Sequence, residues 1–386
     1  MNIELDPEQT QLRETLRSFV DREISPVARQ MEQAGEYPEK IVETMKRLGL
    51  FGVLVPREYG GLELDGVSYA VVFEELSRGW MGVAGILGSH SLATVLIARH
   101  GTDEQRMRWL PDLATGQRRS GIALSEADAG TDLQGIRTVA RRRRDHYVIR
   151  GAKMWITNAR HANPLPVLVK TDPSAEPRHR GMSILMVESD TPGVTVTRDI
   201  GKLGYKGPET CEIVLDDAQV PVENLLGGIE GRGMQQTLGA LEFGRINIAG
   251  RSVGVAQAAY EQAFEYACQR QAFGQAIANF QAVQLKLADL ATEVQAARLV
   301  TWWAASRVGS GRADVETGMA KYFASEVALR STLTSLRVHG GYGYSTEFEI
   351  ERLYRDAPLM AIGEGTNDIL RMVIARGLLR HREQRA

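Results

Sequence analysis

The feature that most constrains the fold is a change of pattern along the chain, from helical to β and back to helical. Apolar residues recur at helical spacing through about the first 115 residues, and again from Gly233 onward. Between about Gly121 and Leu226, short runs rich in β-branched and aromatic residues alternate with turn clusters, which is typical of strands. This order predicts an α+β chain with an N-terminal helical domain over 1–117, a middle β-domain over 118–228 and a C-terminal helical bundle over 229–386.

Local signals place several elements within these domains. Asp6, Pro7 and Gln9 form a helix start, with a cap, a proline at the first helical position and a glutamine three residues after the cap. One buried stripe is expected on the helix that follows, formed by Leu12, Leu16, Phe19, Val20 and Ile24. Strands are expected over 146–150, 184–187 and 193–197, and helices over about 233–268, 280–309, 313–337 and from Thr366 onward.

Charge and cysteine content exclude several classes of protein. The net charge is −2, so neither nucleic acid nor an anionic membrane is expected as the main partner. Cys211 and Cys268 have no paired spacing, which argues against a disulfide framework and a cysteine-based zinc site, and no metal site is expected. No signal peptide is expected at the N-terminus, and no apolar stretch is expected to approach the roughly 20 residues of a membrane span. These features predict a cytoplasmic protein.

Four segments carry residue types suited to a ligand site, although no GxGxxG or P-loop motif is present to hold a nucleotide. The segment 122–132 is an apolar strand that ends in a turn rich in hydroxyl and carboxylate groups, and a capped turn alone would explain it. The segment 153–158, if extended, places Trp155 and Thr157 on one face, suited to a flat heteroaromatic ring; a half-buried strand explains it equally well. The glycines of 337–344 allow close approach to a ligand, or simply end a helix.

The fourth segment, 361–368, contains the strongest candidate for a catalytic residue. Thr366 can cap the apolar helix that follows, and Asp368 suits the first turn of that helix. Glu364 lies between two glycines, where its backbone is free to take an unusual conformation. Capping gives no reason for a carboxylate at this position.

Taken together and in this order, the segments closely resemble the acyl-CoA dehydrogenase family over nearly the whole chain. Residues 123–126, 129–132 and Gly135 fit the first signature of the family, and residues 340–344 with Glu347, Arg352 and Asp356 are similar to the second. An RxxFG…Q element is matched by 270–274 and Gln281, and shorter matches are 202–204 and 211–212.

The resemblance implies a fold, a cofactor and partners. The middle domain would be β-barrel-like and the C-terminal domain a four-helix bundle, with FAD between them. A neighbouring subunit would complete the FAD site in a homotetramer built as a dimer of dimers. The substrate would be an acyl-CoA, and an electron-transfer flavoprotein would receive the electrons.

The resemblance also assigns site residues, with Glu364 aligned to the catalytic base. The flavin and pyrophosphate region is expected to contact Leu124, Ser125, Gly130, Thr131, Trp155 and Thr157. The adenine end is expected to contact Arg270, Phe273, Gln281, Arg337, Val338, Gly340 and Gly341, with further cofactor contacts from Thr366, Asn367 and Asp368. Substrate contacts are expected from Thr131, Glu242, Phe243, Arg245 and Gly365.

The implied reaction is α,β-dehydrogenation of the acyl-CoA to a trans-2-enoyl-CoA. A proton α to a thioester is only modestly acidic, so the developing enolate oxygen needs donors already in place, by resemblance the backbone N–H of Glu364 and a flavin ribityl hydroxyl. Exclusion of water by bound substrate is expected to raise the pKa of Glu364, which suits proton abstraction near neutrality. The β-hydride would pass to the flavin on the opposite face.

Departures from the family pattern bear on the substrate. Arg337 replaces the usual glutamine, and a guanidinium serves a pyrophosphate at least as well. Gly363 replaces a common tyrosine, and Gly244 stands where isovaleryl-type enzymes carry an alternative glutamate base, so extra room implies a short, branched or cyclic acyl group. Val83 stands where glutaryl-type enzymes carry a carboxylate-binding arginine, which lowers the odds of a dicarboxylyl substrate.

Three other interpretations stay open. The same scaffold could act on an acyl group held by a carrier protein, or run as an enoyl-thioester reductase. It could be a related flavin oxidase or monooxygenase, although the monooxygenases generally lack this glutamate. A non-enzymatic flavoprotein that binds DNA is the third, but the chain ends shortly after its last helix without a basic extension.

Overall fold

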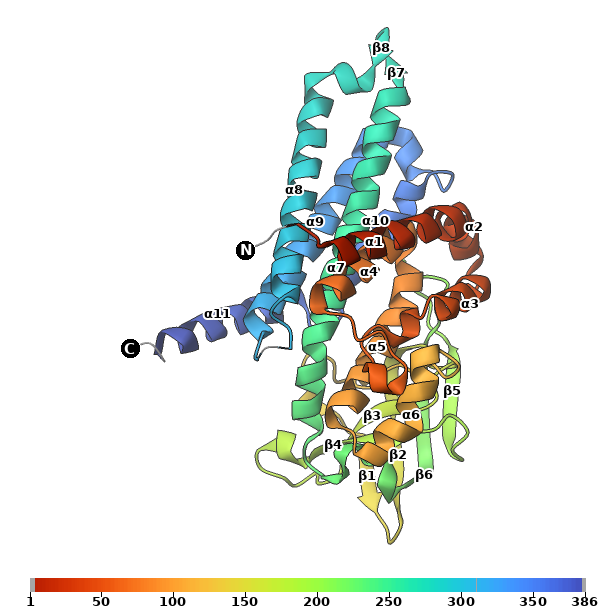
Figure 1. Cartoon of the computed structure of the whole chain (residues 1–386), viewed down its shortest axis with the longest axis vertical. Coiled ribbons are helices and arrows are strands. Elements are labelled where there is room, and N and C mark those ends of the chain that lie inside the picture. Colours follow the sequence, from red (N-terminus) through yellow and green to blue (C-terminus); the bar gives the residue numbers. More distant parts are fainter. Residues whose placement is uncertain (1–3, 310, 384–386) are drawn as a thin grey trace.

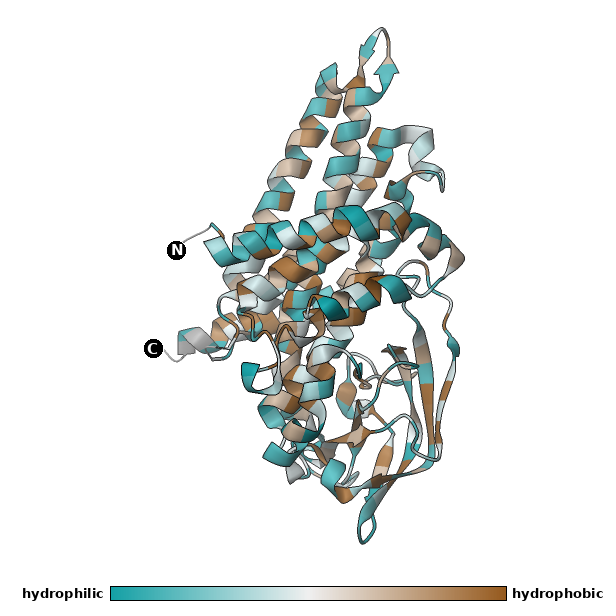
Figure 2. Ribbon diagram, turned by 45° about the vertical axis from the view of Figure 1, so that its right-hand side comes forward, coloured by the Kyte–Doolittle hydropathy of each residue, from teal (hydrophilic) through white to brown (hydrophobic). Residues whose placement is uncertain are grey.

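The computed structural model describes residues 4–309 and 311–383, and its elements follow the expected order of helices, sheet and helices. In Figure 1 the sheet lies at the bottom of the molecule and the long C-terminal helices rise to the top, with N-terminal helices packed alongside both. Figure 2 shows that apolar and polar positions alternate along these helices, as expected where one side of each helix packs inward.

Six helices form the N-terminal part: α1 (Pro7–Phe19), α2 (Ser25–Ala34), α3 (Glu39–Arg47), α4 (Gly66–Gly79), α5 (Met81–His100) and α6 (Asp103–Thr115). Helix α1 begins as predicted, because the Gln9 N–H donates to the Asp6 side chain and the Asp6 N–H donates to the Gln9 side chain. The predicted stripe continues through a π-helical turn, Val20–Ile24, and all its members are buried except Leu12, which is half-buried.

Helix α5 is apolar and 20 residues long, enough to cross a membrane by length and composition alone. The expectation that no apolar stretch approaches this length was therefore wrong. The apolar window of α5 is 89% buried inside the fold, where α5 packs against α4, α6 and α7. A helix that is apolar on all sides suits either a membrane or the centre of a large core, and here it occupies the core.

The middle part is a six-stranded mixed sheet in the order β4-β3-β1-β2-β6-β5. Its strands are β1 (Val139–Arg142), β2 (His146–Thr157), β3 (Leu165–Lys170), β4 (Met182–Val187), β5 (Val194–Asp199) and β6 (Thr210–Pro221). All neighbours pair antiparallel except β1 and β3. The strands predicted over 146–150 and 184–187 are confirmed within β2 and β4, and the one predicted over 193–197 is confirmed by β5, which begins one residue later, at Val194.

The C-terminal part contains α7 (Gly233–Gln269), the hairpin β7 (Gln271–Ala272) and β8 (Gln275–Ala276), α8 (Gln281–Ala305), α9 (Asp314–His339), α10 (Glu349–Ile362) and α11 (Asn367–Glu383). Four of these helices were predicted, but α10 was not. Pro358 lies inside α10 and removes one backbone donor, which obscured the helical signal. Burial of Ile350, Leu353 and Met360 nevertheless holds α10 in place.

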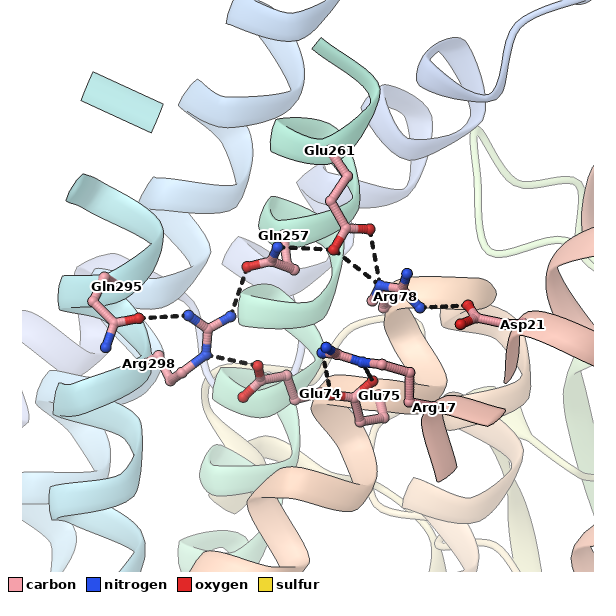
Figure 3. Close-up of polar contacts among 9 residues, drawn as sticks. All are labelled: Arg17, Asp21, Glu74, Glu75, Arg78, Gln257, Glu261, Gln295 and Arg298. Atoms are coloured by element: carbon pink, nitrogen blue, oxygen red, sulfur yellow. Dashed lines mark hydrogen bonds and ion pairs between the residues drawn. The ribbon is translucent and has the colours of Figure 1, made fainter. Parts of the chain in front are cut away.

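Charged pairs join the N-terminal helices to one another and to α7 and α8 (Figure 3). Arg298 Nε lies 2.7 Å from Glu74 Oε1, and Arg17 Nη2 lies 2.7 Å from Glu75 Oε1. Arg78 contacts both Asp21 and Glu261, at 2.7 and 2.8 Å. Each of these arginines therefore has a carboxylate partner, which is the usual requirement for placing a guanidinium in a partly buried position.

Candidate active site

Glu364 occupies the turn that joins α10 to α11. Its φ angle is +55°, in the left-handed region that side-chain-bearing residues rarely adopt, and Gly365 follows with φ +92°. The unusual conformation predicted for Glu364 is thus confirmed. Such a backbone conformation persists only where the surrounding structure imposes it, and it is common at functional sites.

The carboxylate of Glu364 lies directly against Gly244 of α7. A Cβ atom built on Gly244 would be 2.6 Å from Glu364 Oε2 and 3.1 Å from its Cδ, too close for a stable contact. Glycine at position 244 is therefore what allows the Glu364 side chain to lie here. Leu92 of α5 closes the other side of the same spot, with a side-chain carbon 3.4 Å from that Cβ position.

Burial raises the pKa of Glu364 above its ordinary value, while the charges of Arg251, Lys321 and Arg245 act in the opposite direction. Among these cations Arg251 acts most strongly. A carboxylate with a raised pKa in a cleft is a good candidate for a general base near neutral pH.

Lys321 of α9 anchors the turn that carries Glu364. Its side chain is completely buried, and its Nζ donates to Gly365 O at 2.8 Å and to Asn367 Oδ1 at 2.9 Å. Asn367 also donates to Glu326 Oε1 at 2.8 Å. Burial lowers the pKa of Lys321 to about 7. Lys321 was not predicted from the sequence, where its only signal was a charged residue among the small, buried positions of a helix.

Replacing Lys321 by methionine is expected to move the acid limb of the pH–rate profile to higher pH. Loss of a positive charge beside Glu364 raises the pKa of the carboxylate, and the base must be ionised to act, so the limb shifts upward by up to about one unit. Single-turnover flavin reduction between pH 5 and pH 8 measures the shift. The exposed Lys286 on α8, changed to methionine, is the control. An acid limb that stays in place would show that Lys321 does not act on Glu364.

A cavity of about 1040 Å³ lies beside Glu364. It brings together five residues that the sequence analysis assigned to the site: Gly130, Thr131, Arg245, Glu364 and Gly365. Its walls are largely apolar side chains of α7 and α11, namely Met234, Leu238, Leu241, Ile369, Leu370 and Val373. His179, Arg180 and Arg232, all exposed, add positive charge or donors to the same cavity.

A β-bulge in β2 presents Trp155. The register shifts between Lys153 and Ile156, Trp155 has φ +67°, and its side chain is 56% exposed. The simple alternation expected for 153–158 is therefore interrupted, because Lys153 and Ile156 are both buried. Lys153 Nζ donates to Leu124 O at 3.0 Å and Met154 N donates to Ser125 O at 2.9 Å. These bonds hold Leu124 and Ser125 beside the bulge, as the prediction of a shared flavin site requires.

The second group of predicted cofactor residues lies elsewhere in the chain. Hairpin β7–β8 stands at the end of the molecule opposite the sheet (Figure 1). The Arg270 guanidinium lies 5.6 Å from the Tyr342 ring centroid, so the 270–281 and 337–344 segments meet there. Phe273 is 94% exposed, and Gln281, Arg337, Gly340 and Gly341 are exposed as well. Val338 is buried among α7 and α8 side chains, so only its backbone can meet a ligand.

The remaining predicted residues have other neighbours. Glu242 accepts from Ala313 N at 3.3 Å, and Phe243 lies under the Arg99 guanidinium, lining a separate cavity of about 570 Å³. Thr366 caps α11 as predicted, because its Oγ1 accepts from Ile369 N at 3.4 Å. Asp368 lies in the first turn of α11 with an exposed side chain. The structure thus places none of Glu242, Phe243 and Asp368 on the wall of the larger cavity.

Three family models match the chain in the order of its structural parts. They describe the N-terminal domain of acyl-CoA dehydrogenase over residues 6–117, the middle domain over 121–218 and the C-terminal domain over 231–379. The chain belongs to the acyl-CoA dehydrogenase family. Members of this family are FAD-dependent oxidoreductases that act on acyl-CoA, and this chain is accordingly a flavoprotein.

Individual relatives agree with this assignment. A probable acyl-CoA dehydrogenase, YngJ, from Bacillus subtilis is 42% identical over 383 residues, covering 98% of this chain and 100% of the relative. A 3-(aryl)acrylate reductase from Clostridium sporogenes is 39% identical over 372 residues, covering 96% and 98%. The structure of butyryl-CoA dehydrogenase from Megasphaera elsdenii superposes with a TM-score of 0.95 at 34% identity, covering 98% of this chain and 100% of that one.

The residues of the acyl-CoA dehydrogenase fit the cofactor of the family. The exposed indole of Trp155, held on the bulge, offers an apolar surface to a flat ring, and Arg270 and Arg337 offer exposed guanidinium groups to a pyrophosphate. Gly130, Gly340 and Gly341 have no atom within 4 Å of where a Cβ would lie, so a ligand can approach their backbone closely. Among residues 4–309 and 311–383, no cluster of His, Cys, Asp and Glu could hold a metal ion.

Proposed function

We propose that this dehydrogenase oxidises a short, branched or cyclic acyl-CoA to the trans-2-enoyl-CoA, with Glu364 as the catalytic base. The observation that carries the proposal is the Glu364 carboxylate, fixed against Gly244 at the wall of the large cavity. Burial raises the pKa of this carboxylate, so it can take a proton from carbon near neutral pH.

The roles of the chain follow from this arrangement. Glu364 removes the proton from the carbon next to the thioester, and the turn anchored by Lys321 keeps the carboxylate in position. FAD, when bound, supplies the acceptor for the hydride of the neighbouring carbon. Apolar walls from α7 and α11 exclude water from the thioester, while Arg180 and Arg232 suit the phosphates of CoA.

Gly363 supports a small acyl group. It places no side chain next to Glu364, which favours room for a branch. Farther along α7, the Asn247 side chain packs against Gly88 of α5.

The experiment that tests the proposal is anaerobic mixing of the holoenzyme with isobutyryl-, 2-methylbutyryl-, butyryl- and octanoyl-CoA while flavin absorbance is followed. Rapid bleaching with the short or branched thioesters is expected. A clear preference for octanoyl-CoA would contradict the proposed acyl group. Absence of bleaching with every thioester would contradict dehydrogenation itself. Pantetheine thioesters of the same acyl groups lack the nucleotide part of CoA, so their bleaching rates show how much the CoA phosphates contribute to substrate binding.

Reduction of an enoyl thioester is a second candidate function, favoured by the 39% identity to a 3-(aryl)acrylate reductase. The residues would be the same, with Glu364 returning a proton to the α-carbon. Assays in both directions, with an oxidised and a reduced electron carrier, separate the two candidates. Faster turnover of the enoyl-CoA at physiological ratios of carrier would favour the reductase.

For partners, we propose an electron-transfer flavoprotein as electron acceptor and a cytoplasmic homotetramer built as a dimer of dimers. The exposed side chains of Arg270, Phe273 and Arg337 support an assembly. They could complete the FAD site of a neighbouring subunit. Light scattering of the purified protein, with FAD content measured on the same fractions, tests the assembly.

A further inference from the structure

Arg251 of α7 is a buried arginine whose side-chain partner is the Tyr205 phenol and not a carboxylate. Its side chain is among the buried charged groups, with 5% of the residue exposed, and its Nε and Nη2 have no hydrogen-bond acceptor. No ion pair joins it to a carboxylate within the described residues. The arginines of Figure 3 differ, because each of them faces at least one carboxylate. A buried guanidinium is costly to leave unpaired, so this one points to a missing anion.

Arg251 shares one face of α7 with the wall of the active site. Gly244, Asn247 and Arg251 follow one another at helical spacings of three and four residues, so all three face α5. Gly244 lies against Glu364 and Leu92, Asn247 against Gly88, and Arg251 over the ring of Tyr205 at 5.1 Å.

Tyr205 fills the inner end of the same face. Its side chain lies so close to Gly85 of α5 that no Cβ would fit there. The face therefore runs from the base at Gly244, past the Asn247–Gly88 contact, to the guanidinium and the Tyr205 phenol.

The other two cations near the base have more polar neighbours, although Arg245 also leaves its Nε without an acceptor; its Nη1 donates to Asp314 O at 3.4 Å. Burial lowers the pKa of Arg245, and the carboxylates of Asp314 and Glu242 raise it. Lys321 donates to two oxygen acceptors. Arg251 acts on the charge of Glu364 without an ion pair between them, and Glu364 becomes neutral once it has taken the substrate proton. An anionic group on the substrate would balance the charge of Arg251 throughout the reaction.

We propose that Arg251 binds a carboxylate at the far end of the acyl group, so that the preferred substrate is the CoA thioester of a short dicarboxylic acid. The inference rests on the proposed dehydrogenation and specifies its substrate class. Seven residues of helix separate Gly244 and Arg251 by about 10 Å, and helical side chains lean toward the N-terminus, which brings the guanidinium back toward the base. An acyl group of about four or five carbons fits this separation.

Val83 is consistent with such a substrate. The chain has valine where glutaryl-type enzymes carry a carboxylate-binding arginine, and this difference alone argues against a dicarboxylyl substrate. Arg251 provides a guanidinium from α7 instead of α5, on the same side of Glu364. Arg251 was not predicted as a site residue, because no motif surrounds it in the sequence. Its only signal was a charged residue at a position of the helix expected to be buried.

Two matched substrate pairs test the proposal: glutaryl-CoA with pentanoyl-CoA, and 2-methylsuccinyl-CoA with 2-methylbutyryl-CoA. Within each pair only the terminal carboxylate differs from a methyl group. Single-turnover flavin reduction by the parent holoenzyme is expected to favour the carboxylate in at least one pair by about tenfold or more. In Arg251→Gln this ratio is expected to fall by about 100-fold, with partial recovery in Arg251→Lys. Using a ratio within one variant cancels any change in the pKa of Glu364.

Binding gives a second readout that needs no turnover. In a Glu364→Gln background, calorimetric Kd values are expected to show the same preference for the carboxylate and its loss with Arg251→Gln. Arg78→Gln is the control, since Arg78 lies at the α4–α7 junction with its own carboxylates, and it should leave the ratio unchanged. Thermal unfolding checks that each variant is folded.

Two results would overturn the proposal. One is a parent enzyme that prefers the neutral member of both pairs. The other is an Arg251→Gln variant that slows both members of a pair equally, which would mean that Arg251 acts on Glu364 and not on the substrate. If no thioester bleaches the flavin, the proposed function fails, and the Kd values still decide whether Arg251 recognises a carboxylate.

Discussion

Replacement of Glu364 by glutamine is expected to slow substrate-dependent flavin reduction by about three to four orders of magnitude while FAD and acyl-CoA binding persist. Glutamine has nearly the same shape and can keep polar contacts with the surrounding cations, but it cannot accept a proton from carbon. Its backbone would occupy the same left-handed turn, at φ near +55°, as the glutamate does. The loss therefore isolates proton abstraction from folding.

Anaerobic stopped-flow absorbance measures the rate, and the flavin spectrum with and without ligand measures binding. Glu293→Gln, at a half-buried position on α8 where the carboxylate pairs with Arg330, provides a control that should behave like the parent. A Glu364→Gln enzyme that bleaches its flavin as fast as the parent would remove Glu364 from the chemistry.

Replacement of Gly244 by alanine is expected to lower the rate of flavin reduction by about 100-fold. The new methyl group would lie 2.6 Å from Glu364 Oε2, so the carboxylate must move away from its present position. A displacement of about 1 Å from a productive geometry costs a factor of this order. The reduction potential of bound FAD should change little, because the substitution adds no charge.

Gly239→Ala is the matched control, since Gly239 belongs to the same helix and a Cβ there meets only His100, at an ordinary 3.8 Å. Both substitutions improve helix propensity by about 1 kcal/mol, so Gly239→Ala should unfold at the same or a higher temperature. A Gly244→Ala enzyme with full activity would mean that Glu364 is not confined by α7 as the structure indicates.

Much of the fold could be predicted because its signals are local. The capping box at Asp6 and Gln9, and the long helices α7, α8 and α9, follow from residue types and periodicity within short windows. Helix α10 was not predicted because Pro358 has a low helix propensity. Packing of the apolar side of α10 against the bundle overrides that local preference.

The site divides in the same way. Glu364 could be found because two glycines and a resemblance mark it, and the structure confirms its left-handed backbone. Lys321 and Arg251 could not be found, because their significance comes from residues far away in sequence: Gly365 and Asn367 for the lysine, Tyr205 for the arginine. The bulge at Trp155 was also hidden, since it depends on pairing between β2 and β6.

The burial of α5 has a consequence for synthesis in the cell. Helix α5 ends at His100, and α7, which covers one side of it, begins only at Gly233, about 130 residues later. At a ribosomal rate of roughly 5–20 residues per second, the nascent chain carries this apolar helix without α7 for roughly 7 to 27 s. A fragment truncated before α7 is expected to aggregate or to bind chaperones, because α4 and α6 alone leave one side of α5 uncovered.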